Sequence, residues 1–97
     1  MKLKTKVQYF AIIRELANRR EDVLDVREGS TVLDVLNLLG EKYGEKFRDY
    51  VFDPKTGTPR AYLQFLVNGD SISNSGGLST VLTDNSSLVI IPPVGGG

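Results

Sequence analysis

One helical stripe constrains the fold of this chain more than any other feature. Between residues 32 and 43 the apolar side chains recur at the spacing of helical turns, as Val32, Val35, Leu36, Leu39 and Tyr43. This spacing places all of them on one side of an α-helix. Ser30 or Thr31 can cap the first turn, and Gly44 is expected to end the helix in the left-handed conformation. A helix with one apolar face must bury that face against other elements, so the remaining segments must cover it.

Four segments have the composition of strands, namely residues 3–9, 23–27, 63–67 and 88–91. In the first, Leu3, Thr5, Val7 and Tyr9 alternate with polar residues, which is the period of a half-buried strand. In the second, Leu24 and Val26 are the expected inward pair. The last strand is apolar on both faces, which favours a central place in the sheet, and Pro92 and Pro93 end it because proline donates no ladder hydrogen bond.

A short helix is expected at residues 11–17, and residues 53–59 and 71–79 are expected to be loops or irregular structure. The order of the elements predicts an α+β domain in which antiparallel strands surround one packed helix. With 97 residues, the chain has the length of one domain.

Composition excludes several kinds of site. The sequence has no Cys and no His, so a thiolate nucleophile, a Cys/His zinc site and an imidazole base are all missing. Asp53, Asp70 and Asp84 each stand in a turn, where aspartate commonly caps its own backbone, so we expect no metal site. The adjacent acids Glu21 and Asp22 are expected to be solvated. No cofactor is expected.

Charge and hydropathy indicate where the protein acts. Lys and Arg together number 12, as do Asp and Glu, and a net charge of zero argues against a nucleic-acid partner. No apolar run approaches the length of a membrane span, and the first residues lack the apolar region of a signal peptide. We therefore expect a cytoplasmic protein that binds neither nucleic acid nor membrane.

The C-terminus is the first candidate for chemistry. Gly95, Gly96 and Gly97 follow Val94 directly after the two prolines. Glycine has no Cβ, so such a tail can enter a narrow channel and present the terminal carboxylate to a partner. The alternative is an inert chain end.

Four stretches together resemble a known family. They are residues 7–11 with Arg14-Glu15-Leu16, residues 29–32 with Leu36, residues 66–69, and residues 90–97 with their double proline and terminal glycines. They resemble the ubiquitin-like sulfur carriers, which include the small subunit of molybdopterin synthase (MoaD) and ThiS. The resemblance implies a β-grasp fold, a mixed sheet packed on one main helix, with residues 1–94 as the domain and 95–97 as a flexible glycine tail.

The resemblance also implies a function. An ATP-dependent adenylyltransferase of the ubiquitin-activating type would adenylate Gly97, and a sulfur donor would convert it to a thiocarboxylate. The chain would then donate sulfur for molybdopterin synthesis as the small subunit of molybdopterin synthase, whose large subunit is the catalytic partner. The chain itself would not be an enzyme. The loop at residues 53–62 is longer than in compact members, which favours the molybdopterin branch or archaeal carriers that also modify proteins.

Two other functions remain open. The chain can be a ubiquitin-like modifier that joins Gly97 to lysines of target proteins, or an interaction module whose tail is inert. The carrier and the modifier need the same activated glycine, so the sequence does not separate them.

A docking surface is expected on the sheet face away from the helix. Phe10 and Leu66 break the alternation of their strands and point opposite to the inward residues, as does one alternate pair of the last strand. We expect these residues to bind the partner proteins, together with the tail residues Pro93, Val94, Gly95 and Gly96. The alternative is that residues 53–62 or 71–79 fold over this face. Arg14 and Glu15 are expected to have structural roles.

Overall fold

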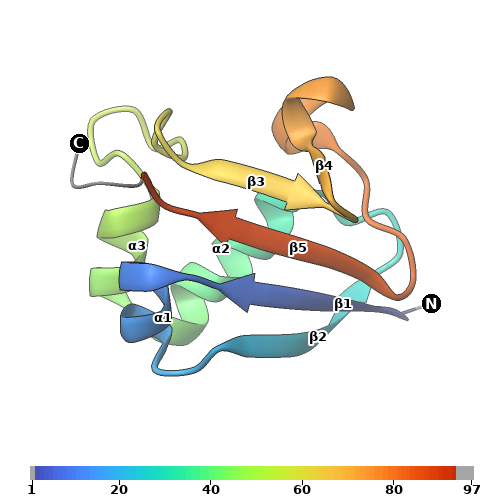
Figure 1. Ribbon diagram of the computed structural model, residues 1–97, viewed down its shortest axis with the longest axis horizontal. Helices are drawn as coiled ribbons and strands as arrows, with labels where there is room; N and C mark the ends of the chain where they lie inside the picture. The colour runs from blue at the N-terminus through green and yellow to red at the C-terminus, as the bar shows by residue number, and fades with distance from the viewer. Residues whose placement is uncertain (1, 94–97) are drawn as a thin grey trace.

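The computed structural model describes residues 2–93, which form one sheet with helices packed on one of its sides (Figure 1). The strands are β1 (Lys2–Tyr9), β2 (Glu21–Arg27), β3 (Gln64–Val67), β4 (Asp70–Ser71) and β5 (Ser86–Ile91). The helices are α1 (Ala11–Ala17), α2 (Val32–Tyr43) and α3 (Glu45–Val51), with short 3-10 turns η1 (Ile72–Asn74) and η2 (Gly77–Ser79).

The sheet is mixed, with strand order β2-β1-β5-β3-β4. β5 is central, as its apolar composition predicts. The expectation of antiparallel strands throughout is wrong for the central pair, because β1 and β5 run parallel while the other neighbours are antiparallel. The reason is the long connection: α2, α3, β3 and β4 all lie between the two strands in sequence, and a parallel pair requires such a crossover. A mixed sheet on one main helix is thus confirmed.

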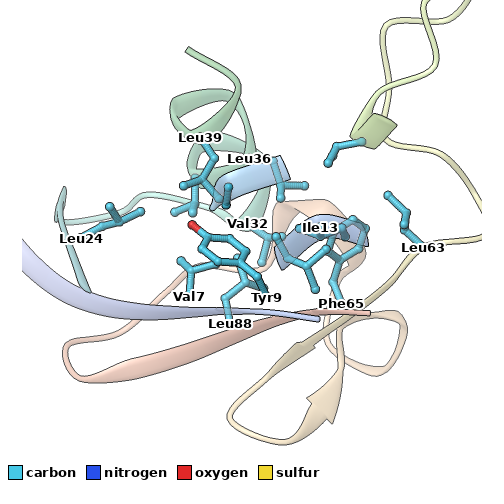
Figure 2. Packing of buried hydrophobic residues seen from close by; sticks show 14 of the residues in the cluster. Val7, Tyr9, Ile13, Leu24, Val32, Leu36, Leu39, Leu63, Phe65 and Leu88 are labelled. Carbon is cyan, nitrogen blue, oxygen red and sulfur yellow. The ribbon is translucent and has the colours of Figure 1, made fainter. Parts of the chain in front are cut away.

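The core lies between the sheet and α2. Val32, Leu36 and Leu39 are fully buried, and Figure 2 shows Val7, Tyr9 and Leu88 pointing from the sheet toward Leu36 and Leu39. The helix begins where the sequence indicates: the Thr31 hydroxyl accepts a hydrogen bond from the backbone N–H of Asp34, and the Asp34 carboxylate accepts one from the N–H of Thr31. This reciprocal pair is a capping box.

The end of α2 differs from the expectation. Gly44 has φ +89° and ψ −164°, so its φ is positive but its conformation is not left-handed helical. It directly precedes α3, and the chain must change direction within one residue; a positive φ of this kind favours glycine. The sequence patterns above predict no element at residues 45–51, and the structure folds them into α3, which buries Phe47 and Val51.

The other connections are more regular than the sequence indicates. The stretch at residues 71–79 holds η1 and η2, and Ile72 and the nearby Leu82 are buried in the core. Across residues 2–93, no helix has the length and hydropathy needed to cross a membrane.

Candidate functional site

An apolar surface lies on the sheet face that the helices leave open. It consists of Phe10, Leu66, Val89 and Ile91, and we call it the open-face patch. Phe10 is 40% exposed, and the other three are half-buried. Along β5 buried and half-buried residues alternate, so Leu88 and Ile90 face the core while Val89 and Ile91 face outward. These two are the alternate pair of the last strand that the sequence left unassigned.

Strand register makes the patch continuous. Leu66 of β3 lies directly opposite Val89 of β5, and such cross-strand pairs stand on the same face within contact distance. Tyr9 lies beside Ile90 in the parallel pair. The next residue of each strand, Phe10 and Ile91, therefore stands at the same end of the outer face. The structure thus brings together the two residues that sequence reasoning singled out.

Phe10 is held in place from the start of α1. It is the extended N-cap residue of that helix, and its carbonyl accepts a hydrogen bond from the N–H of Ile13 at 3.1 Å. The guanidinium of Arg14 lies 5.7 Å from the centre of the Phe10 ring, a cation–π distance, and its Nε donates to the carbonyl of Tyr9. Arg14 therefore orients the aromatic ring that the patch presents.

One exposed apolar residue near Phe10 was missed by sequence reasoning. Ile12 is 38% exposed, because the short helix α1 buries Ile13 and Ala17 and turns Ile12 away from the core. The helical spacing of Ile13 and Ala17 was a signal that could have revealed it.

Neither connecting segment covers the patch. Ile72 and Leu78 of the 71–79 segment pack against the core, on the helix side of the sheet. The 53–62 loop is tied to the end of α3, where Arg60 donates to the carbonyls of Asp49 and Tyr50. The alternative in which one of these segments folds over the outer face is therefore wrong.

β5 ends beside the patch. Pro92 is buried and Pro93 is exposed, and neither can extend the pairing between β5 and β3 beyond Ile91 and Gln64. Val94, Gly95, Gly96 and Gly97, which the sequence nominates for activation and partner binding, lie outside the described residues. Pro93 is thus the last described residue of the proposed site, and Ile91 of the patch lies two residues before it.

Asp22 corrects an expectation. The sequence suggested a solvated acid, but only 5% of Asp22 is exposed, because it lies on the same inner face of β2 as Leu24 and Val26. Its carboxylate accepts hydrogen bonds from the hydroxyls of Tyr9, at 2.7 Å, and Tyr43. It also accepts from two cations: Arg19 at 2.6 Å and Lys42 at 3.2 Å.

These contacts set the protonation of the cluster. Burial by itself raises the pKa of Asp22, but the hydrogen bonds from Tyr43, Tyr9, Arg19 and Lys42 outweigh it and lower the pKa to about 2. Burial and the hydrogen bond to Asp22 raise the pKa of Tyr43 to about 12 and that of Tyr9 further still. Asp22 is therefore a charged structural group at neutral pH, and both of its carboxylate oxygens accept hydrogen bonds from side chains of the same domain.

No catalytic or metal-binding arrangement is found in the described part of the chain. Within residues 2–93, no three Asp or Glu residues lie close enough together to hold a metal ion. A groove of about 520 Å³ lies beside β3 between residues 59–61 and 71–78, and its lining contains Arg60 but no carboxylate. The described residues therefore offer an exposed apolar surface for binding, with no cluster of carboxylates beside it.

Comparison with known proteins agrees with this geometry. The family model described as "ThiS family" matches residues 7–97. Small archaeal modifier protein 3 of Haloferax volcanii is 27% identical over 95 residues, which cover 98% of this chain and all of that protein.

Two solved structures extend the comparison. The small archaeal modifier protein 1 (SAMP1) of Methanosarcina acetivorans is 32% identical, with a TM-score of 0.84 over 100% of this chain and 99% of the other. A putative molybdopterin converting factor subunit 1 from Pyrococcus furiosus is 28% identical, with a TM-score of 0.75 over 95% and 99%. The β-grasp, ubiquitin-like fold is thereby confirmed.

Proposed function

The chain belongs to the ThiS family, and from this membership we propose that it is a sulfur carrier that acts through the C-terminal carboxylate of Gly97. A free carboxylate is a poor electrophile, because oxide would have to leave. Attack of the carboxylate on the α-phosphorus of ATP forms an acyl-adenylate and releases pyrophosphate. A sulfur nucleophile then displaces AMP and leaves a thiocarboxylate on Gly97.

The open-face patch is the observation that carries this proposal. Its four apolar residues lie on the described surface beside the point where the chain leaves β5 at Pro92 and Pro93. An exposed apolar surface of this kind marks a protein interface. A partner that binds the patch is well placed to receive the four residues that follow Pro93, and the catalytic groups that this chain lacks would come from that partner.

Two partners fit successive steps. The first is an ATP-dependent adenylyltransferase of the ubiquitin-activating type, which activates Gly97. The second is the large subunit of molybdopterin synthase, which would use the thiocarboxylate as its sulfur source, with this chain as the non-catalytic small subunit. The similarity to the Pyrococcus furiosus molybdopterin converting factor subunit supports this second assignment.

A second candidate is a protein modifier that joins Gly97 to target lysines through an isopeptide bond. Similarity to the Haloferax volcanii and Methanosarcina acetivorans small archaeal modifier proteins favours it. The carrier and the modifier share the acyl-adenylate and differ in the nucleophile that displaces AMP: sulfur in one case and a lysine amine in the other.

Intact mass spectrometry tests the proposal. The full chain is incubated with the host adenylyltransferase, ATP and a sulfide source, and the carrier is expected to gain the mass of one sulfur in exchange for one oxygen. A variant lacking Gly97 is the matched control; it should gain nothing and keep the melting temperature of the parent chain, since the last residue of a chain generally contributes little to stability.

Each outcome has a defined meaning. Absence of the exchange in the full chain, with an adenylyltransferase that is active on another substrate, contradicts the carrier assignment. Higher-mass conjugates in cell extract that depend on Gly97 and ATP support the modifier. If deletion of Gly97 also unfolds the domain, the separation between tail and domain is wrong.

A further inference from the structure

The outer edge of β2 is the one long strand edge that residues 2–93 leave open. β2 spans Glu21–Arg27 and pairs with β1 alone, whereas the opposite edge of the sheet, β4, is only two residues long and turns directly into η1. Proteins commonly protect an open edge with charged side chains, lysine above all, with proline or a bulge, or by keeping it short. The sequence of β2, Glu-Asp-Val-Leu-Asp-Val-Arg, contains neither lysine nor proline, and its charges are of both signs, so an edge of complementary charge can match them.

The hydrogen-bond pattern shows which backbone groups are available. The N–H of Tyr9 donates to the carbonyl of Arg20 at 2.9 Å, in the register that places Thr5 opposite Leu24. Bonded and non-bonded pairs alternate along an antiparallel ladder, so Asp22, Leu24 and Val26 bond to β1. The N–H groups of Glu21, Val23, Asp25 and Arg27 are therefore directed to the open side, as are the carbonyls of the first three; the carbonyl of Arg27 accepts a hydrogen bond from the N–H of Ser30 at 3.0 Å.

We propose that this edge pairs with the same edge of a second copy of the chain, which gives a continuous ten-stranded sheet about a two-fold axis. An antiparallel pairing centred on Leu24 matches all four available residues. Val23 then lies opposite Asp25 of the second copy, and Glu21 lies opposite Arg27 of the second copy. The Val23–Asp25 pair can exchange two backbone hydrogen bonds, and in the outer pair the N–H of Arg27 can donate to the carbonyl of Glu21 of the second copy.

Charge complementarity favours a second copy of the chain as the partner of this edge. In the symmetric register the carboxylate of Glu21 faces the guanidinium of Arg27 of the second copy, and the same contact recurs on the other side of the axis. Opposite charges directly across a strand pair are stabilising, and like charges are destabilising. Among residues 2–93, Glu21 forms an ion pair only with Lys6, at 3.5 Å with both side chains about half exposed, and Arg27 has no ion-pair partner.

Exposed apolar side chains flank the edge on both faces. Val23 is 60% exposed on the outer face of β2. Leu38 of α2 is 40% exposed on the helix side, where it lines a shallow hollow of about 200 Å³ with Asp25, Val26 and Arg27. The pairing would bury both residues and would bring the two Leu24 side chains together as a non-bonded pair, the closer kind. It leaves the open-face patch accessible, because Leu66, Val89 and Ile91 lie on β3 and β5.

A charge exchange tests the pairing. Sedimentation equilibrium of the full chain, up to about 1 mM protein, is expected to show a concentration-dependent dimer. Glu21→Arg places Arg opposite Arg at both symmetric positions, and Arg27→Glu places Glu opposite Glu, so each variant should weaken dimerisation about tenfold or more. The double variant E21R/R27E restores opposite charges and should regain most of the affinity. Lys6→Ala removes the intramolecular partner of Glu21 and should leave dimerisation in place.

Amide hydrogen exchange locates the contact. The N–H groups of Val23 and Asp25 should be protected in the dimer and exchange rapidly in monomeric Arg27→Glu, whereas Leu24 should be protected in both, because it bonds to β1. A chain that stays monomeric at every concentration overturns the proposal. So does a dimer that withstands both single charge reversals, or one that is lost with Leu66→Asp, since that dimer would form through the open-face patch.

Discussion

The hydroxyl of Tyr9 donates a 2.7 Å hydrogen bond to the buried carboxylate of Asp22. Tyr9 is the last residue of β1 and lies fully inside the core, and Asp22 is near the start of β2. The same carboxylate accepts from Tyr43 and Lys42 at the end of α2 and from Arg19 before β2. One side chain thereby connects the sheet, the main helix and the turn between α1 and β2.

Asp22→Asn should lower the free energy of unfolding by about 2–4 kcal/mol, because it leaves Arg19 and Lys42 facing a neutral amide and forces one amide N–H toward a donor hydroxyl. Urea unfolding measures the loss. Asp25→Asn is the matched control: Asp25 lies on the same strand but is exposed and pairs only with Lys4, so it should cost less than about 0.5 kcal/mol. If the two variants lose the same free energy of unfolding, the buried cluster contributes no more to stability than the exposed Asp25–Lys4 ion pair.

Stability should depend on the charge of Asp22 at acid pH. The folded state holds the pKa near 2 against a usual 3.8, so its carboxylate contributes stability that is complete above the usual value and is lost as pH falls toward 2. The lowered pKa corresponds to a contribution of about 2 kcal/mol to the free energy of unfolding. Urea titrations from pH 6 to 2 should show that the difference in free energy of unfolding between the parent chain and Asp22→Asn becomes smaller below about pH 4. A difference that stays constant down to pH 2 would contradict the lowered pKa of Asp22 in the folded state.

Leu36→Ala should cost about 2–5 kcal/mol, because the side chain is fully buried between α2 and the sheet. Leu38→Ala on the same helix is the control, measured at low protein concentration. Leu38 is 40% exposed, so its truncation should cost less than about 1 kcal/mol. A melting temperature that is unchanged by Leu36→Ala would mean that the apolar stripe does not face the core.

Leu66→Asp should leave the fold intact and weaken binding to the adenylyltransferase by about 1 kcal/mol or more, because it places a charge in the open-face patch. Isothermal titration calorimetry measures the binding, and circular dichroism the fold. Val81→Asp is the control: Val81 is equally apolar and 57% exposed, but it bridges to Thr31 at the start of α2, away from the patch. If Leu66→Asp unfolds the domain, Leu66 belongs to the core and the patch is not a docking surface.

The periodic elements could be predicted from sequence because their side chains carry the pattern locally. The alternation from Leu3 to Tyr9 and the stripe from Val32 to Tyr43 each describe one face of one element, and both appear where predicted. The same reasoning anticipated an open face at Phe10 and Leu66, since a residue that breaks alternation must point away from the core. Pro92 and Pro93 end β5 for a covalent reason that needs no tertiary contact.

Only the tertiary structure decided what lies next to what. The parallel pairing of β1 with β5 depends on a long crossover that no local pattern encodes. The burial of Asp22 depends on four donors from three separate segments, of which Tyr43 and Lys42 stand some twenty residues away in sequence. From sequence alone, a carboxylate in an alternating strand is expected to be solvated, because burying it without hydrogen-bond donors or cations is unfavourable. Only the tertiary structure shows that such partners surround Asp22. Sequence periodicity determines which face of an element a residue occupies. Whether a charged residue is stable on a buried face depends on hydrogen-bond and ion-pair partners that the tertiary structure brings from other segments.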